Sequence, residues 1–192
     1  FYPPLSWTLG AMLGLVMPWT WTPIVYTWLA LTAAGYSLYY LAKEFATPTA
    51  ALLAATFYIV NPYMLFTAYE RTAYAELLAA AFIPLLLLAI LRPRPTIPGI
   101  ALPLALLWLT NDPAAVMSTY ALAFLAVVRL LLAGRLNDDA SAAPRCLVSE
   151  TWASRHQASL RLALSPFAGT ALGLALTAVS LLPAIYERHL PQ

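Results

Sequence analysis

Long apolar segments that carry at most one charge recur along this chain, and no other feature of the sequence constrains its fold as strongly. Six of them approach the roughly 20 residues that an α-helix needs to cross the hydrocarbon core of a bilayer. They comprise residues 24–42, 49–66, 75–91, 97–109, 113–132 and 162–182. Only 9% of the residues are charged, against roughly 25% in an average globular protein. The sequence therefore predicts an all-α, polytopic transmembrane helical bundle of about six spans and excludes a soluble domain.

A seventh apolar segment, residues 5–17, is too short for a span. As a helix it would be about 20 Å long, and it lies between Pro3-Pro4 and the tryptophan-rich segment PWTWTP. Tryptophan is enriched where a bilayer meets water, so we expect an interfacial helix that lies along the membrane surface. The predicted organisation is a single transmembrane domain, with an interfacial segment 1–22, five spans in 23–133, a cytoplasmic loop 134–160, and the last span with an outer-face tail in 161–192.

Two of the six segments are marginal as spans. Residues 49–66 contain Asn61-Pro62, where the missing amide of Pro62 should kink or end a helix. Residues 97–109 would form a helix only about 20 Å long. The polar turn after this short helix should therefore lie below the outer headgroups, in a wet cavity.

The basic residues are distributed unequally between the two sides of such a bundle. Eight of the ten Lys and Arg residues fall on one side: Lys43, Arg92, Arg94, Arg129, Arg135, Arg145, Arg155 and Arg161. Only Arg71 and Arg188 fall on the other side. Cytoplasmic loops carry an excess of Lys and Arg, so the first side is predicted to be cytoplasmic. The outer side carries the carboxylates Glu70, Glu76, Asp112 and Glu187, which makes it the side where chemistry is expected.

The composition excludes several functional classes. With a net charge of +2 and no basic patch, the chain is not expected to bind nucleic acid. Cys146 is the only cysteine and cannot form an intramolecular disulfide or a thiolate cluster, and His156 and His189 cannot by themselves build a zinc site. No cofactor and no metal site is predicted, although a divalent metal stays open. Any reaction should use carboxylate and arginine chemistry.

The first candidate site is the connection that precedes residues 75–91. It contains Tyr69, Glu70 and Arg71, and Glu76 follows one turn into the next helix. A charge within a span costs roughly 2.5–3.5 kcal/mol on insertion scales, so Glu76 should face a cavity and have a partner; the alternative is a glutamate that only complements the helix dipole. Arg71 could recognise a phosphate or carboxylate through its paired donors, or it could only anchor the helix end among lipid headgroups.

The second candidate site is the connection LTNDPAA. Asp112 before Pro113 has the residue types of a helix start, and a capping role is the favoured interpretation for this aspartate. Asn111 could hydrogen-bond a sugar or complete the turn.

The third candidate site follows the last predicted span, where Glu187, Arg188 and His189 are consecutive. Glu187 and His189 could act as acid, base or phosphate ligands, whereas anchoring at the interface is the alternative. Other aromatic residues are interpreted as interfacial belts and packing residues: Trp7, Trp19, Trp21, Trp28, Tyr58, Tyr63, Tyr69 and Tyr74.

Three segments carry a resemblance to a known family: FYPPLSWTLGAML, YYLAKEFATPTAALLAATFYIVNPYMLFTAYERTAYAELLAAAFIPLLLL and LLPAIYERH. They resemble the bacterial membrane proteins labelled 6-pyruvoyl-tetrahydropterin synthase-related, best over residues 38–88. That family is similar to the GT-C superfamily of polytopic glycosyltransferases, which use polyprenyl-phosphate-linked sugars. Pterin chemistry finds no support, because a soluble zinc-dependent synthase needs histidine ligands that this chain lacks.

The resemblance implies a GT-C-like fold in which residues 3–17 form a juxtamembrane helix on the outer face, with the site between this helix and the spans. Arg71 and Glu76 match the family's Arg and Glu, and Glu187 matches an acidic residue after the last span. Asn111 stands where a histidine is expected. The span and acidic loop that carry the catalytic aspartate of these enzymes would precede Phe1, so we expect a fragment that is inactive alone.

We therefore expect a GT-C-like glycosyltransferase module of the bacterial inner (plasma) membrane that handles a polyprenyl-phosphate-linked sugar at the outer face. The candidate catalytic residues are Glu76 and Glu187, and the candidate substrate-binding residues are Tyr69, Glu70, Arg71, Asn111, Asp112, Arg188 and His189. The expected partners are the lipid bilayer and a polyprenyl-phosphate sugar donor. A transporter or flippase segment and a non-catalytic scaffold of an envelope-synthesis complex are the alternatives. The sequence leaves the sugar, the acceptor and the oligomeric state open.

Overall fold

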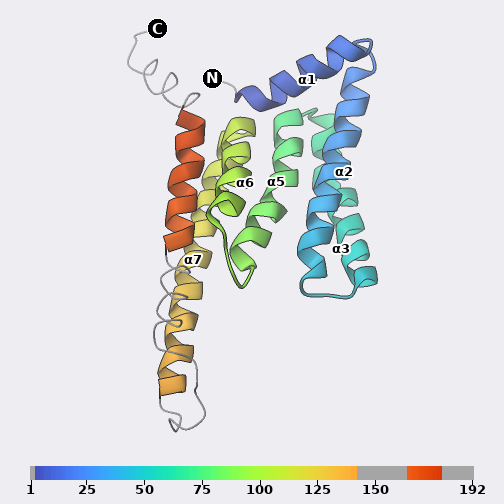
Figure 1. The fold of residues 1–192 in the computed structure, drawn as a ribbon. Helices are drawn as coiled ribbons and strands as arrows, with labels where there is room; N and C mark the ends of the chain where they lie inside the picture. The colour runs from blue at the N-terminus through green and yellow to red at the C-terminus, as the bar shows by residue number, and fades with distance from the viewer. Residues whose placement is uncertain (1–2, 142–163, 179–192) are drawn as a thin grey trace.

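The computed structural model describes residues 3–141 and 164–178, and every regular element in these ranges is a helix. In chain order the elements are α1 (Pro4–Val16), α2 (Thr22–Lys43), α3 (Pro48–Val60), α4 (Pro62–Leu65), the π-helix η1 (Phe66–Glu70), α5 (Tyr74–Leu91), α6 (Ile97–Thr110), α7 (Asp112–Ser141) and a further helix, Leu164–Ala178 (Figure 1). The predicted all-α class is confirmed for these ranges.

Two of these helices are long and apolar enough to cross a membrane. They are α5 and the Asp112–Leu132 part of α7, and a third is added if α3 and Pro62–Glu70 count as one bent span. α2 has 22 residues, but it is rich in tyrosines and hydroxyl-bearing residues, whereas α6 and Leu164–Ala178 are shorter. By length and composition, the described residues thus contain two or three candidate spans where the sequence predicts about six.

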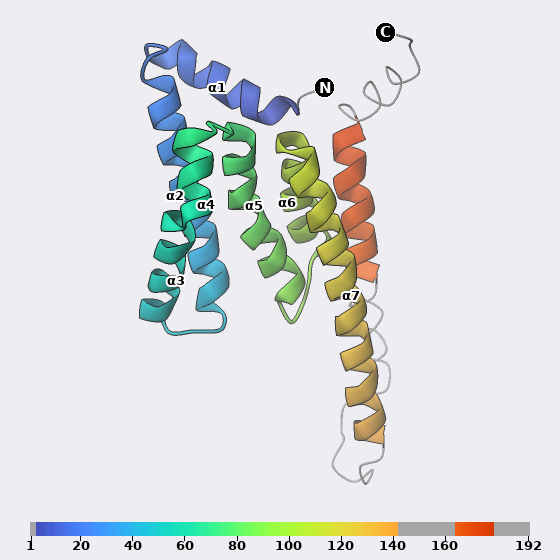
Figure 2. The same cartoon turned by 180° about the vertical axis from the view of Figure 1, so that it is seen from behind.

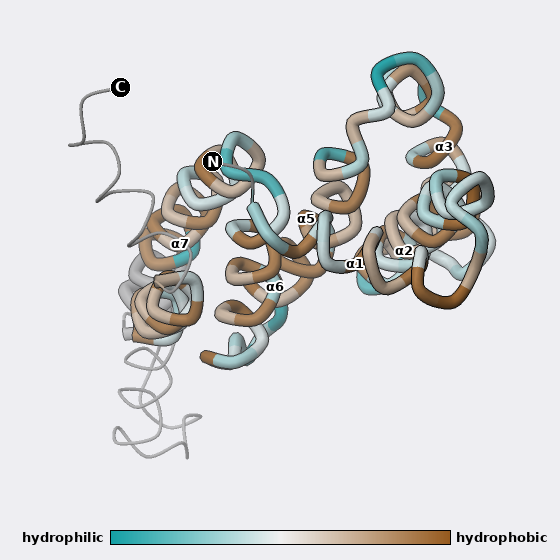
Figure 3. Tube along the Cα trace, turned by 90° about the horizontal axis from the view of Figure 1, so that it is seen from above, coloured by the Kyte–Doolittle hydropathy of each residue, from teal (hydrophilic) through white to brown (hydrophobic). Residues whose placement is uncertain are grey.

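The helices of the bundle run alternately in opposite directions, and α1 lies across one end of it (Figures 1 and 2). α1 packs against α2, α5 and α6. We call the end of the bundle that α1 crosses the α1 end. Seen from the α1 end, α5 lies between α2 and α6 (Figure 3). The short apolar segment near the N-terminus is therefore a helix across the ends of the longer helices, and its place along a membrane surface stays a prediction.

Two clusters of buried side chains hold the bundle together. The first joins α2 to α5 and includes Tyr26, Ala30, Ala34, Leu77 and Ala81. The second joins α5, α6 and α7 and includes Leu86, Ile90, Ile100, Leu104 and Leu122. Small residues such as alanine allow helix backbones to approach closely. Because α5 belongs to both clusters, the place of its first turn is fixed relative to α2, α6 and α7.

The predicted break at Asn61-Pro62 is confirmed. The axes of Pro48–Val60 and Pro62–Glu70 are bent by 44°. The amide of Met64 donates to Oδ1 of Asn61 at 2.9 Å, so Asn61 caps α4, and its Nδ2 donates to the carbonyl of Tyr58. The Nδ2 bond thus replaces the one hydrogen bond that Pro62, which has no N–H, cannot donate to the Tyr58 carbonyl, and Oδ1 caps the next helix.

The end opposite α1 is basic and joined by side-chain contacts. Nη1 of Arg129 in α7 donates to the carbonyl oxygens of Ile90 and of Arg92, the latter at 2.9 Å. A cation there satisfies the terminal carbonyls of α5 and complements its dipole. Nη2 of Arg92 lies 4.0 Å from Oε1 of Glu44, at the C-terminus of α2.

The predicted cytoplasmic loop of residues 134–160 begins later than expected. α7 continues to Ser141. Polar residues indicate where a segment leaves an apolar environment, but they do not by themselves end a helix, because most of them allow helical hydrogen bonding to continue. The rest of this loop lies outside the described residues. Of the predicted last span, 162–182, the structure describes the helix Leu164–Ala178.

Glycines bring the helix Leu164–Ala178 against α6. A Cβ on Gly169 would lie 2.9 Å from Cβ of Ile100, and one on Gly173 would lie 3.1 Å from the carbonyl oxygen of Ala101. Thr177, one turn further, is fully buried. This small-residue stripe at a spacing of four residues is typical of helix packing in membranes, and the sequence interpretation missed it.

Candidate functional site

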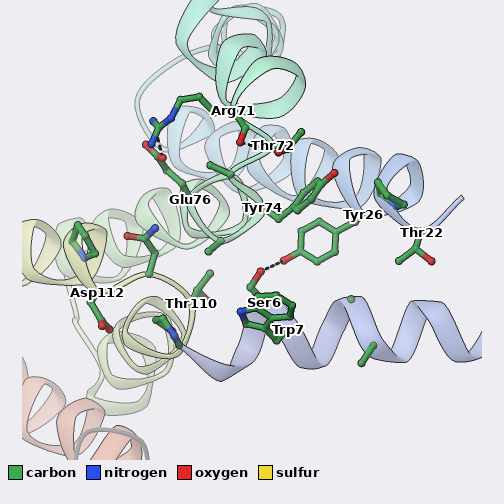
Figure 4. A pocket seen from close by; sticks show the side chains of 18 of the residues that line it. Ser6, Trp7, Thr22, Tyr26, Arg71, Thr72, Tyr74, Glu76, Thr110 and Asp112 are labelled. Atoms are coloured by element: carbon green, nitrogen blue, oxygen red, sulfur yellow. Dashed lines mark hydrogen bonds and ion pairs between the residues drawn. The ribbon is translucent and has the colours of Figure 1, made fainter. Parts of the chain in front are cut away.

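A cavity of about 710 Å³ lies at the α1 end, between α1 and the ends of the bundle (Figure 4). Segments far apart in the sequence line it. These are α1 with the start of α2 (Pro3, Ser6, Trp7, Gly10, Ala11, Trp19, Thr22, Pro23 and Tyr26), the turn into α5 (residues 71–76), and the α6–α7 connection (residues 110–113). We call it the α1 cavity.

Arg71 and Glu76 form an ion pair at the edge of this cavity. Nη1 of Arg71 lies 3.1 Å from Oε2 of Glu76, and the hydroxyl of Tyr63 donates to Oε1 of the same carboxylate. Glu76 is 26% exposed and Arg71 is 47% exposed. The expectation that Glu76 faces a cavity and has a partner is therefore confirmed. Because Arg71 contacts Glu76 through Nη1, the other N–H donors of its guanidinium remain accessible.

A strained turn carries Arg71 to this position. The amide of Arg71 donates to the carbonyl of Phe66 at 3.0 Å, and the amide of Ala73 donates to the carbonyl of Thr67 at 3.0 Å. Between them Thr72 has a φ of 48°, in the left-handed region that β-branched residues rarely adopt. Such strain of about 1–3 kcal/mol and π-helical turns both concentrate at functional sites.

The α6–α7 connection contributes Asn111 and Asp112. The amide of Ala114 donates to Oδ1 of Asn111 at 3.0 Å, and the amide of Asn111 donates to the carbonyl of Leu107 at 2.8 Å. Asn111 therefore caps α7, and the favoured interpretation of Asp112 as the cap is wrong. The reason is that α7 begins one residue earlier than predicted, with Asp112 in its first turn. The Asp112 side chain lines the α1 cavity instead.

Aromatic side chains form the opposite wall of the cavity. Oγ of Ser6 and the hydroxyl of Tyr26 share a hydrogen bond of 3.0 Å, which joins α1 to α2. The ring of Tyr26 meets that of Tyr74 edge to face, with centroids 5.2 Å apart. Trp7 and Trp19 also line the cavity. The sequence interpretation missed this wall, and its one signal was the polar pair Ser6 and Tyr26 inside apolar helices.

A second cavity of about 640 Å³ meets the first at the ion pair. Arg71, Glu76, Asn111 and Pro113 line both cavities. The Arg71–Glu76 pair therefore stands at a boundary between two hollows of the bundle.

The structure brings together four of the predicted site residues, Arg71, Glu76, Asn111 and Asp112. Tyr69 and Glu70 are exposed on η1 and line neither cavity. The other predicted site residues lie outside the described part of the chain: Glu187, Arg188 and His189.

Among the described residues, the acid and base side chains that line the α1 cavity are one cation, Arg71, and two carboxylates, Glu76 and Asp112. The N-termini of α5 and α7 also point to this region, and each is equivalent to roughly half a positive charge. Within the ranges 3–141 and 164–178, no group of three or more His, Cys, Asp or Glu residues could hold a metal ion. In the described part of the chain, the polar chemistry of the cavity therefore rests on one guanidinium, two carboxylates, amide groups and hydroxyls.

In the described residues, the fold and site thus define a bundle of apolar helices with a mainly apolar cavity at one end, whose edge carries the Arg71–Glu76 ion pair. Comparisons of the chain with family models, with curated proteins and with solved structures find no match.

Proposed function

We propose that this chain is a membrane-embedded, GT-C-like glycosyltransferase module that handles a polyprenyl-phosphate-linked sugar at the outer face of a bacterial inner membrane. One observation carries the proposal. A cavity between a crosswise helix and the ends of the bundle holds Arg71, fixed by Glu76, beside Asn111 and Asp112. Six spans and the GT-C fold belong to the same proposal.

Arg71 is assigned to the phosphate of the lipid carrier. During transfer, an acceptor hydroxyl oxygen bonds to the anomeric carbon and its proton passes to a carboxylate base, while the bond between the sugar and the phosphate oxygen breaks and the phosphate takes the electron pair. A guanidinium stabilises this developing charge through paired hydrogen bonds. The 3.1 Å contact with Glu76 supports a positioning role for the carboxylate, because both of its oxygens are engaged by Arg71 and Tyr63.

The acceptor would occupy the α1 cavity. Asp112 and Asn111 offer polar contacts to an acceptor hydroxyl, and Trp7 and Tyr26 offer aromatic surface of the kind that packs on sugar rings. Glu187, Arg188 and His189 stay candidates for further substrate contacts. The basic residues at the opposite end, such as Lys43 and Arg92, support an orientation with the α1 end outside.

Transfer of sugar from a polyprenyl-phosphate-linked donor, catalysed by the full-length protein in proteoliposomes, tests the proposal. Arg71→Ala should lower transfer about a hundredfold, the usual effect of removing one charge-stabilising donor, and Arg71→Lys should restore part of it. Arg92→Ala is the matched control, because Arg92 is also a partly exposed, ion-paired arginine, at the other end. Equal transfer by the Arg71→Ala and Arg92→Ala variants would refute the proposal.

A transporter is the second candidate, and the bent helix pair favours it. Discontinuous helices line substrate paths in many transporters, and α3 and α4 are bent by 44° next to Tyr63 and Arg71. However, Glu76 of the ion pair is in the first turn of α5, which lies near the α1 end of the bundle rather than at its middle (Figure 1). Solute uptake without sugar transfer would select the transporter.

A further inference from the structure

Two prolines interrupt the helices on either side of the ion pair. Pro62 follows α3, and Pro84 lies inside α5, where it is fully buried. Because proline has no N–H, the carbonyl four residues before it loses its usual helical partner. The two carbonyls concerned are those of Tyr58 and Ala80. The segment between the two breaks carries the ion pair of the α1 cavity.

One residue, Tyr58, takes part in both breaks. Its carbonyl accepts from Nδ2 of Asn61, which replaces the amide that Pro62 lacks. Its hydroxyl donates to the carbonyl of Ala80 at 2.9 Å and thereby replaces the amide that Pro84 lacks. The Tyr58 side chain is partly buried against the cluster that joins α2 to α5. The hydroxyl therefore connects the end of α3 directly to the first half of α5.

We propose that Tyr58 is a positioning residue for the Arg71–Glu76 pair and acts through the Ala80 carbonyl. Glu76 precedes Ala80 by four residues, which is about one helical turn. A restraint on the Ala80 turn therefore also restrains the turn that carries Glu76, and Glu76 in turn contacts Arg71 at 3.1 Å. This inference rests on the proposed function only for the activity in which the effect on catalysis is measured.

The first half of α5 depends on this restraint because the helix is interrupted on both sides. Before it, the chain turns at Thr72, whose φ is 48°. After it, Pro84 removes a hydrogen bond to the rest of α5. The Ala80 residue is buried, and a buried carbonyl without a donor is unfavourable. The Tyr58 hydroxyl thus supplies a hydrogen bond that α5 cannot supply by itself.

Direct contact with a ligand is the competing role, because Tyr58 also lines the second cavity. A phenolic hydroxyl has a single proton to donate. Tyr58 uses this proton for the Ala80 carbonyl. This geometry favours positioning over ligand contact, and the two roles predict different responses to a change at Pro84.

The test is a cycle of four full-length proteins: the unchanged chain, Tyr58→Phe, Pro84→Ala and the double variant. Tyr58→Phe removes only the hydroxyl. Pro84→Ala gives α5 an amide that can donate to the Ala80 carbonyl, so the hydroxyl is no longer required. Tyr36→Phe is the matched control, because it removes a hydroxyl that hydrogen-bonds Tyr40 at 3.1 Å on the exposed face of α2.

Sugar transfer in proteoliposomes is measured first. We expect Tyr58→Phe to lower kcat about tenfold, since small displacements of positioned groups slow catalysis strongly. The KM for the lipid-linked donor should stay within about twofold, because the loss falls on the transition state. In the Pro84→Ala background, Tyr58→Phe should leave kcat nearly unchanged, and Tyr36→Phe should have no effect. An equal loss of kcat in both backgrounds would mean that the hydroxyl contacts a ligand and would overturn the proposal.

Amide hydrogen exchange measures the restraint without any activity. Tyr58→Phe should raise exchange about tenfold over residues 71–80, which corresponds to about 1.4 kcal/mol, and should leave α6 unchanged. The increase should be absent in the Pro84→Ala background. Exchange that rises equally in α6 would identify Tyr58 as a general stabilising residue and would overturn the proposal. If Pro84→Ala does not fold, the local exchange of Tyr58→Phe still decides.

The positioning role and the proposed function fail separately. If the protein transfers no sugar while exchange over residues 71–80 responds to Tyr58→Phe alone, the restraint stands and the glycosyltransferase proposal falls. If transfer depends on Arg71 but Tyr58→Phe changes neither kcat nor local exchange, the proposed function stands and the role of Tyr58 falls. A changed exchange with an unchanged kcat also refutes the positioning role.

Discussion

Nη1 of Arg71 and Oε2 of Glu76 meet at 3.1 Å across a turn in which Thr72 has a φ of 48°. The two residues are close in sequence, but the side chains face each other only because the chain reverses between η1 and α5 (Figure 4). The same pair borders the α1 cavity and the second cavity. Local backbone geometry thus places Arg71, the one guanidinium that the described residues bring to this region, at the boundary between the two cavities.

The ion pair should contribute little to stability. Both side chains are partly exposed, and exposed pairs are worth about 0.2–1 kcal/mol. A double-mutant cycle of Arg71→Ala and Glu76→Gln, followed by thermal unfolding in detergent, should give a coupling free energy of at most about 1 kcal/mol. The loss of sugar transfer in Arg71→Ala should be far larger than its loss of stability can explain. A coupling energy several times larger would instead identify the pair as a structural element.

Thr72→Gly should stabilise the protein. Glycine adopts a positive φ without the steric cost that a β-branched residue meets, a gain of about 1 kcal/mol. Thr72→Ala is the matched control, because it removes the same hydroxyl but keeps a Cβ. This hydroxyl donates to the Arg71 carbonyl at 2.8 Å. Thermal unfolding in detergent compares the two variants. The strain argument fails if Thr72→Gly is no more stable than Thr72→Ala.

The side chain of Asn111, rather than that of Asp112, should act as the N-cap of α7. Asn111→Ala removes the acceptor for the Ala114 amide and should cost about 1 kcal/mol in unfolding free energy. Asn111→Asp keeps a side-chain acceptor and should retain most of the stability. Asp112→Ala should cost less than Asn111→Ala, since it loses only an interaction with the helix dipole. The reverse order in thermal unfolding would contradict the assignment.

Gly173→Leu should separate the helix Leu164–Ala178 from α6. A side chain at this position meets the Ala101 carbonyl oxygen at 3.1 Å and the Leu104 side chain at 3.2 Å, so overpacking should cost about 1–3 kcal/mol or more. Ala175→Leu adds the same bulk on an exposed position of the same helix. Thermal unfolding in detergent should show a loss for Gly173→Leu alone. Equal losses of stability in the two variants would mean that a larger side chain anywhere on this helix is destabilising.

The orientation of the bundle can be tested with Cys146, the only cysteine of the chain. With the α1 end outside, the segment after α7 lies in the cytoplasm. A membrane-impermeant maleimide should therefore label Cys146 only after spheroplasts are permeabilised. Labelling of intact spheroplasts would place the α1 end on the cytoplasmic side and remove the outer-face site.

Several features follow from the sequence because they depend on local chemistry. The break at Asn61-Pro62 requires only the missing amide of proline. The need of Glu76 for a partner follows from the cost of an unpaired charge among apolar helices. The helix before Met17 is too short for a span, and its placement across the ends of longer helices agrees with that limit.

Other features required the tertiary structure. In helices that are apolar on nearly every face, periodicity carries little information about which face packs against protein and which faces lipid. The sequence assigned Trp7 and Trp19 to interfacial belts and packing, and both are largely exposed. Only the fold shows that they also line a cavity with Tyr26 and Tyr74. Small residues of α5, such as Ala79 and Ala80, likewise line the second cavity only through the positions of α3 and α7.

The sequence by itself determined the helical class, the unequal distribution of charge and the residues that need a polar partner, because each depends on composition or on neighbours along the chain. Only the tertiary structure decided which residues meet. Ser6 pairs with Tyr26, and Asn111 joins Arg71 at the boundary of two cavities, because the rotation of each helix and the crossing of α1 are set by packing between segments far apart in the sequence.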